Sequence, residues 1–233
     1  MRIREQFLVI FVCLMFLLPS VAFSEKTPKT AAELIAKYPD EWTTATVHPF
    51  LQGVQDGTLA EEAFFTWLAQ DYHFAGTLLD SQCLILMKAP RADQSLLIGG
   101  LIALEDELSW FEANAGVFNI DLSVAVLPTN QAYRDFLLAL QYKSYAAQIT
   151  CLWALERVYY DAWSSALPCQ PKYQEFVERW STAGFKAYVD ALEASVNKAL
   201  AEATVEQRKE AELYFKWTLL YEKKFWDMAI SAE

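Results

Sequence analysis

The sequence Trp67-Leu-Ala-Gln-Asp71-Tyr-His-Phe74 lies in the middle of a segment, residues 61–87, that contains no proline. This segment is long enough for about seven helical turns. The turn pair Asp56-Gly57 precedes it and Pro90 follows it, so the sequence predicts one long helix between these two signals. Apolar residues occur almost all the way round this helix, which is typical of a helix in the centre of a bundle.

Asp71 is the exceptional residue on the face of this helix that we expect to be buried. Burying a carboxylate without a partner costs several kcal/mol, so Asp71 requires a hydrogen-bond donor. A bound ligand is able to supply that donor, which makes Asp71 a candidate binding residue. The face itself, at alternating spacings of four and three, consists of Phe64, Leu68, Asp71, Ala75, Leu78, Gln82 and Ile85.

Helical patterns also dominate the rest of the sequence, and no segment shows a sustained strand period. The glycine pair Gly99-Gly100 costs about 1 kcal/mol per glycine within a helix, which predicts close contact with a neighbouring helix there. The predicted fold is all-α, a single bundle of roughly seven to nine helices. The other expected elements are residues 30–47, bent at 38–40, a turn at 48–50 into a short apolar segment, residues 93–117, residues 129–167 with Thr129 as N-cap and a joint near 141–144, and residues 172–181, 184–201 and 204–232.

The composition limits the classes of partner. The chain has 233 residues, enough for one domain with a sizeable core, and 54% of them are hydrophobic. The formal net charge is −11 and the body of the chain has no basic cluster, so nucleic acid and anionic membrane surfaces are poor partners. Aromatic residues make up 15%, more flat rings than a helical core needs for volume alone.

Residues 1–24 differ from the rest of the sequence. A short basic-leaning region precedes an apolar run over residues 7–18, and Ala22-Phe23-Ser24 places small residues where a signal peptidase reads. We expect a signal peptide over residues 1–24 and one helical domain over residues 25–233, with no stable membrane insertion after cleavage. The expected location is the periplasm, the cell exterior, or an organelle reached through the endoplasmic reticulum. Retention of the segment as a membrane anchor is the alternative.

Cysteine and histidine spacing gives no cofactor site. Cleavage would leave Cys83, Cys151 and Cys169, which match no zinc or redox motif. We expect Cys83 and Cys151 to be buried apolar residues, whereas Cys169 lies in a turn and is a candidate surface thiol. His48 and His73 show no metal-binding pairing, so we expect neither a metal nor a haem cofactor.

Two further acids occupy predicted helix faces in the manner of Asp71. Glu222 and Glu156 each lie near the centre of an otherwise apolar or aromatic face. Either acid could instead point to solvent or pair with Lys223 or Arg157, and Glu156 competes with a second apolar face on its helix. The two faces consist of Phe215, Leu219, Glu222, Trp226 and Ala229, and of Tyr145, Ile149, Leu152, Glu156, Tyr159 and Trp163.

Acids among aromatic rings on the inner faces of a bundle suit one class of ligand. The rings stack on a flat, nitrogen-rich, neutral or cationic ring, and the carboxylates accept from its amino groups and ring nitrogens. The sequence shows no Ser-His-Asp arrangement, phosphate-binding loop or dinucleotide fingerprint.

Motifs along the chain together resemble the TenA family, also called thiaminase II. They are His48-Pro-Phe-Leu-x-Gly53, Asp56-Gly-Thr-Leu59, Phe64, Gln70-Asp71-Tyr72, Pro128-Thr, Ala132-Tyr133 and Tyr221-Glu222-x-x-Phe225-Trp226-x-Met228-Ala229. The resemblance implies a haem-oxygenase-like helical fold without haem, usually a homotetramer, that acts on the pyrimidine half of thiamin or of its breakdown products. It also implies that Asp71 binds the pyrimidine, that Tyr133 is a site tyrosine and that Glu222 is the acid–base glutamate.

The chain departs from the family at the catalytic cysteine. Cys151-Leu-Trp153 imitates the start of the family's Cys-x-Trp-x-Tyr stretch, but Leu155 replaces its tyrosine. Counting without gaps from Tyr133 places Glu156 at the cysteine position and Tyr160 at the tyrosine position. Phe74 and Trp180 stand where many members have site tyrosines. The resemblance is therefore to the branch without the cysteine, whose members resemble amidohydrolases of aminopyrimidines.

The resulting hypothesis is hydrolytic salvage of a thiamin-derived aminopyrimidine. Glu156 would activate water, Glu222 would donate a proton, and Asp71 would orient the substrate, with Phe74, Tyr133, Tyr160 and Trp180 around it. The alternatives are a non-catalytic pyrimidine- or thiamin-binding protein, a true thiaminase that uses Cys151, and an oxidase related to pyrroloquinoline quinone synthesis. Helix geometry separates residues 151 and 156 by a full turn plus roughly 140°, so we expect Glu156 in the pocket and Cys151 buried away from it.

Overall fold

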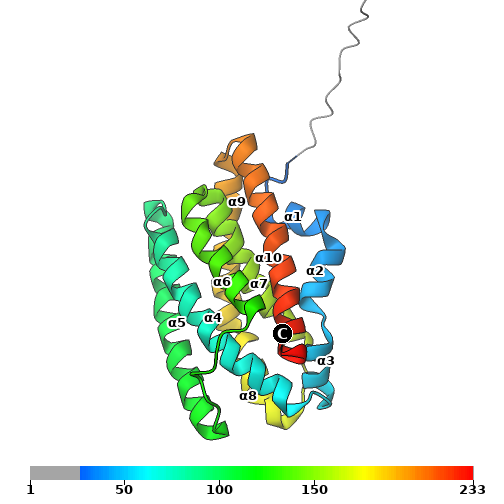
Figure 1. The fold of residues 1–233 in the computed structure, drawn as a ribbon. Coiled ribbons are helices and arrows are strands. Elements are labelled where there is room, and N and C mark those ends of the chain that lie inside the picture. Colours follow the sequence, from blue (N-terminus) through cyan, green and yellow to red (C-terminus); the bar gives the residue numbers. More distant parts are fainter. Residues whose placement is uncertain (1–26, 233) are drawn as a thin grey trace, which may run out of the picture.

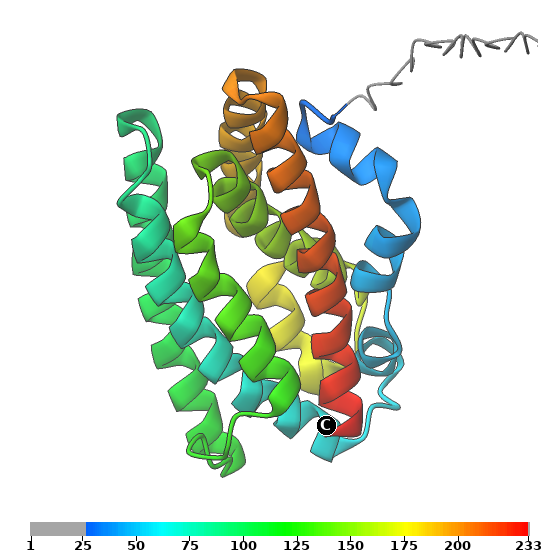
Figure 2. The ribbon, with the colours of Figure 1, turned by 45° about the horizontal axis from the view of Figure 1, so that its top comes forward.

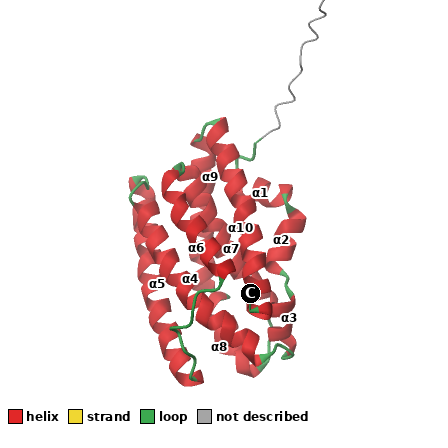
Figure 3. Ribbon diagram, viewed as in Figure 1, coloured by secondary structure: helices red, strands yellow, loops and turns green. Residues whose placement is uncertain are grey.

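The computed structural model describes residues 27–232, so the predicted signal peptide lies outside the described residues. Within that range all regular structure is helical, which confirms the predicted all-α class. Figure 3 shows these helices joined by short connections and one longer loop. The helices are α1 (Ala31–Lys37), α2 (Pro39–Thr46), α3 (Pro49–Asp56), α4 (Glu61–Leu86), α5 (Arg91–Phe118), α6 (Pro128–Ala139), α7 (Tyr145–Ser165), α8 (Gln174–Trp180), α9 (Ala183–Glu202) and α10 (Val205–Ser231), with 3-10 turns at Leu140–Tyr142 and Pro171–Tyr173.

The helix boundaries follow local signals in the sequence. α1 and α2 are the one bent helix predicted there, divided at Tyr38 before Pro39. The short apolar segment after His48 is itself a helix, and the Phe50 amide donates to Nδ1 of His48 over 3.2 Å, which caps its start. Thr129 is not an N-cap as expected. Leu127 occupies that position, since Pro128 already suits the first helical turn.

Helix α7 lies at the centre of the bundle. It packs against α10, α9, α2 and α8, while α4 packs against α5, α6 and α10. Figures 1 and 2 show α5 along one side of the molecule and α1–α3 along the opposite side. None of the helices between residues 27 and 232 combines the length and apolarity that a membrane span requires.

Indole rings form a connected cluster in the core. Trp67 and Trp163 are fully buried, with ring centroids 5.0 Å apart and planes inclined by 63°. Trp163 in turn stacks on Trp180 at 5.3 Å, and Tyr159 stacks on Trp226 at 5.8 Å. The unusual aromatic content therefore forms a connected layer that links α4, α7, α8 and α10.

The predicted close contact at the glycine pair occurs at Gly100 only. A Cβ atom at Gly100 would collide with Nε2 of Gln82 and with the hydroxyl of Tyr188, whereas a Cβ atom at Gly99 would enter open space. The Gln82 side chain cannot easily move away, because it is fully buried and its Nε2 donates to the carbonyl of Leu97 over 2.8 Å. Gly100 thus permits α5 to approach α4 and α9.

The two neighbouring glycines should respond oppositely to alanine. Gly100→Ala should lower the free energy of unfolding by about 1–3 kcal/mol, because it overpacks the contact with Gln82 and Tyr188. Gly99→Ala should raise it by up to about 1 kcal/mol, since only helix propensity changes. Denaturant unfolding of both variants measures these changes, and equal effects of the two substitutions would contradict the assigned contact.

Candidate functional site

A cavity of about 330 Å³ lies between the centres of α4, α5, α7 and α10. Tyr133 of α6 closes one side, and residues from the end of α8 and the start of α9 line another. The volume suits a small ring compound. Five acids contribute to its wall. One is the exposed Asp106 of α5, and the others come one from each of the four helices named first: Asp71, Glu107, Glu156 and Glu222.

Asp71 is held by a tyrosine from α7. Only 4% of Asp71 is exposed, and the hydroxyl of Tyr159 donates to its Oδ2 atom. Burial raises the pKa of Asp71 well above its usual value, the Tyr159 hydrogen bond lowers it, and the nearby Glu107 and Glu222 raise it further. The expected donor for Asp71 is therefore present in the protein, and one carboxyl oxygen is left for a ligand.

Glu222 is held by the tyrosine that the family resemblance indicates. The hydroxyl of Tyr133 donates to Oε1 of Glu222 over 2.5 Å, and Glu222 is 4% exposed. Tyr221 stacks on Tyr133 with centroids 5.0 Å apart, and Phe74 contacts the same ring at 4.7 Å. Burial raises the pKa of Glu222 to about 8, against a smaller lowering by Tyr133, so this carboxyl is largely protonated at neutral pH.

Glu156 has no such donor. It is 7% exposed, lines the cavity, and makes no side-chain hydrogen bond or ion pair with residues 27–232. Arg157 does not pair with it, because its guanidinium binds Asp161 at 3.0 Å and Glu193 at 3.1 Å. Burial, then the charges of Glu107 and Glu222, raise the pKa of Glu156 well above its usual value. Its carboxyl group is free to contact a ligand.

Glu107 is the acid that sequence reasoning missed. Oε2 of Glu107 accepts from Nε1 of Trp180 over 3.3 Å, and burial raises the pKa of Glu107 to about 7. A signal was present, because the alternating spacing of four and three recurs on this helix. That face of α5 consists of Leu97, Gly100, Leu104, Glu107 and Phe111, of which Leu97, Gly100, Leu104 and Phe111 are buried.

A model of the TENA/THI-4/PQQC family matches residues 35–232. The chain belongs to the TENA/THI-4/PQQC family. The resemblance seen in the sequence motifs is thereby confirmed. A probable bifunctional TENA-E protein of Glycine max is 33% identical over 197 residues, covering 79% of this chain and 86% of the relative. An aminopyrimidine aminohydrolase of Bacillus subtilis is 27% identical over 228 residues, covering 91% of each chain.

Solved structures show the same architecture. A TenA homologue from Pyrococcus furiosus superposes with a TM-score of 0.82 at 29% identity, covering 85% of this chain and 98% of that one. A domain from Shewanella denitrificans with a heme oxygenase-like fold gives a TM-score of 0.68 at 15% identity, covering 85% and 90%. The fold is thus haem-oxygenase-like, as expected.

Cys151 does not line the cavity. Sγ of Cys151 is 3.0 Å from Oγ1 of Thr218, and both residues are fully buried. Burial raises the pKa of the Cys151 thiol to about 12. The structure therefore places Glu156 in the cavity and Cys151 beside it in the packed core.

The remaining site residues are placed as follows. Phe74, Tyr133 and Trp180 line the cavity, but Tyr160 does not; its ring instead contacts Phe185, with centroids 6.3 Å apart. Tyr159 takes the place expected for Tyr160. One residue turns a helix by about 100°, so a count that is off by one selects the wrong face. Tyr159, by contrast, follows Glu156 by three residues on the face that the sequence pattern defined.

The other cysteines differ from expectation. Cys83 is exposed, not buried, because it follows Gln82 and so lies about 100° from the buried face of α4. Cys169 is partly exposed, but partial burial raises the pKa of its thiol, which disfavours the reactive thiolate.

The histidines have structural partners. Nε2 of His48 is 3.0 Å from Oδ1 of Asp227, and Nε2 of His73 donates to the carbonyl of Val124 over 3.0 Å. No group of three or more His, Cys, Asp or Glu positioned to bind a metal occurs in the part of the chain that the structure describes.

The raised pKa of Glu222 predicts pH-dependent stability. An unfolded glutamate ionises above about pH 4.3, whereas folded Glu222 keeps its proton until about pH 8. The contribution of Glu222 to the free energy of unfolding is therefore greatest below about pH 4.3. It falls as the pH rises and is lost once the pH has passed about 8. Glu222→Gln removes the titration. Its melting temperature relative to the wild type should rise by several degrees between pH 5 and pH 9.

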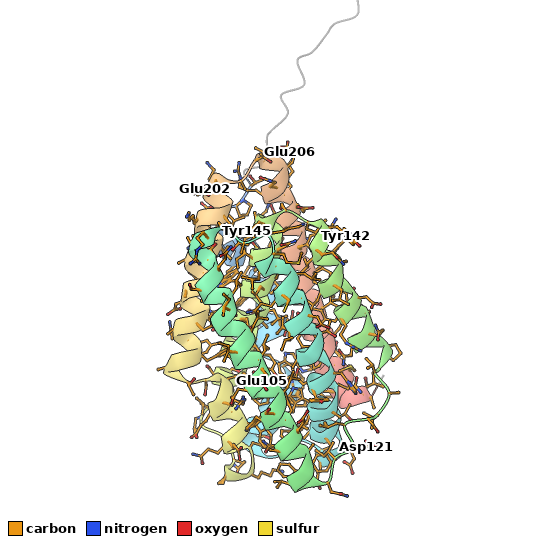
Figure 4. All side chains as sticks on the ribbon, turned by 90° about the vertical axis from the view of Figure 1, so that its left-hand side faces the viewer. Glu105, Asp121, Tyr142, Tyr145, Glu202 and Glu206 are labelled. Carbon is orange, nitrogen blue, oxygen red and sulfur yellow. The ribbon has the colours of Figure 1, made fainter. Side chains whose placement is uncertain are left out.

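Glu105→Gln is the matched control, because Glu105 is exposed on the outer face of α5 (Figure 4). Its melting temperature relative to the wild type should change little over the same range. A difference for Glu222→Gln that stays constant with pH would contradict the buried, protonated carboxyl.

Proposed function

We propose that this protein hydrolyses an aminopyrimidine derived from thiamin, as an aminopyrimidine aminohydrolase or amidohydrolase. The observation that carries the proposal is the cavity itself, in which Asp71, Glu156 and Glu222 face one small space while Cys151 lies outside its wall. The aminohydrolase named among the relatives supports the same reaction class.

Aromatic side chains supply the surface for a pyrimidine ring. Phe74, Phe225 and Trp180 line the cavity and offer ring faces for stacking. Asp71 accepts from an amino group or a protonated ring nitrogen, which fixes the orientation of the substrate. The substrate's donors also favour the ionised forms of the carboxyl groups that they contact, and so oppose the effect of burial.

Glu156 and Glu222 divide the proton transfers between them. Glu156 accepts a proton from water, whose oxygen bonds to the carbon that carries the leaving amine. The carbon–nitrogen bond breaks, its electron pair leaves with nitrogen, and the products are an alcohol and ammonia. Glu222 donates to a ring nitrogen or to the leaving nitrogen. For a formylated amine the water bonds to the formyl carbon instead, which releases the free amine and formate.

The two glutamates and the cysteine should respond differently to substitution. Glu156→Gln and Glu222→Gln should each lower kcat by at least about 10²-fold, the usual worth of a general acid or base, while substrate binding is largely retained. Cys151→Ser should retain turnover, because the sulfur does not line the cavity. Mass identification of products from aminomethylpyrimidine, its formyl derivative and thiamin measures these effects.

Two of the alternative functions have their own results in this experiment. Loss of activity in Cys151→Ser together with release of a thiazole would select a thiaminase. Ligand binding by the wild type without ammonia, formate or a thiazole would select a binding protein.

The proposal extends to assembly and location. The family resemblance supports a homotetramer, and α10 offers an apolar surface for one: Leu213, Trp217 and Leu220 share a face and are 44%, 41% and 46% exposed.

The hydrophobic run in residues 1–24 supports export or entry into the endoplasmic reticulum. Light scattering of the purified protein and the N-terminal sequence of the mature chain test these two points.

A further inference from the structure

The cavity holds more carboxyl groups than the protein supplies with hydrogen-bond donors or cations. Among the described residues that line it, Arg179 is the one cationic side chain, and its Nη2 atom pairs with Asp106 at 3.3 Å. The guanidinium of Arg179 also lies over the ring of Trp110, 4.4 Å from its centroid. The charge of Arg179 also lowers the pKa of Glu107, against the larger raising effect of burial, so a single cation serves the five acids that line the cavity.

The protein's own hydrogen-bond donors satisfy these carboxyl groups only in part. Asp71 receives the hydroxyl of Tyr159, and Glu222 receives that of Tyr133. Glu107 receives a single indole N–H, and Glu156, although 7% exposed, receives none from residues 27–232. A carboxyl group has two oxygens, so Asp71, Glu107 and Glu222 each keep one oxygen without a protein donor, and Glu156 keeps both.

Glu107 also differs from the other acids in its position. It lies next to Asp106 and Ala103, which are exposed residues of α5 that line the cavity, whereas Asp71 and Glu222 are almost fully buried. Glu107 thus faces the open side of the cavity. It is also close enough to Asp71 and Glu156 for its charge to raise the pKa of both. A ligand whose ring is bound by Asp71 and Glu222 would direct a substituent towards Glu107.

We infer that Glu107 binds the positively charged amino group of the substrate's side chain and makes the cavity selective for free amines over neutral groups of the same size. This inference rests on the proposed function. An ammonium group supplies three N–H donors and one positive charge, which matches the open acceptors of Glu107 and Glu156. Glu107 makes and breaks no covalent bond, so it is a specificity-determining residue.

The test compares two ligands of nearly equal shape. Aminomethylpyrimidine carries the ammonium, and hydroxymethylpyrimidine, the alcohol that its hydrolysis would give, carries a neutral group in the same place. Dissociation constants for both are measured by calorimetry in a Glu222→Gln background, which separates binding from turnover. Glu107→Gln should weaken binding of the amine by about tenfold or more, as expected for loss of a charge-assisted hydrogen bond, and binding of the alcohol by less than about twofold.

Two further variants test whether the effect on binding comes from the charge at residue 107. Glu107→Asp keeps the carboxylate and should keep the preference for the amine. Glu105→Gln removes an exposed acid from the outer face of the same helix and should change neither affinity. Equal weakening of both ligands by Glu107→Gln, no weakening of either, or an equal effect of Glu105→Gln would overturn the inference.

The outcome is independent of whether the enzyme proposal holds. If the Glu222→Gln protein prefers the amine and loses that preference when Glu107→Gln is added, while the wild type releases no ammonia, the inference stands and the proposed reaction fails. If the wild type releases ammonia and Glu107→Gln keeps the preference, the reaction stands and the inference fails. A wild type that binds neither ligand overturns both.

Discussion

Burial of carboxyl groups among aromatic rings is the constraint on which this structure depends. A buried acid without a donor is costly, and here the donors come from other helices than the acids. Tyr133 of α6 donates to Glu222 of α10, Tyr159 of α7 donates to Asp71 of α4, and Trp180 of α8 donates to Glu107 of α5. These three bonds connect six helices around one cavity, so the same contacts that satisfy the acids also fix the positions of the helices that carry them.

The cavity is therefore a place where stability is given up for binding. Burial raises the pKa of each of the four acids, which means that their ionised forms are disfavoured until a ligand supplies donors or positive charge. Perturbed acids that gather in one cavity are typical of functional sites. Four apolar side chains would fill the same space at lower cost, but they would give a nitrogen-rich ring no means of recognition.

Much of this arrangement was readable from the sequence, because helix periodicity decides which residues share a face. The alternating spacing of four and three identified Asp71, Glu156 and Glu222 as acids on otherwise apolar faces, and all three line the cavity. The same rule applied to residues 97–111 would have identified Glu107. Tyr159 was missed for another reason: an ungapped count selected Tyr160, and the direction of a side chain changes by about 100° for each residue. Which tyrosine meets which acid depends on contacts between distant helices, and no local pattern encodes them.

The electrostatics of the cavity also bear on which nucleophile it can use. A thiol needs to lose its proton to attack a ring, and positive neighbours help it to do so. Cys151 has the opposite surroundings, because burial comes first among the causes that raise the pKa of its thiol to about 12, and the charge of Glu222 adds to it. A surplus of acids disfavours a thiolate for the same reason that it favours a cationic ligand. Water activated by a carboxylate avoids this conflict, since the attacking group need not carry a full negative charge before the substrate is bound. The position of Glu156 in the cavity wall, the burial of Cys151 outside it and the surplus of acids are thus parts of one arrangement.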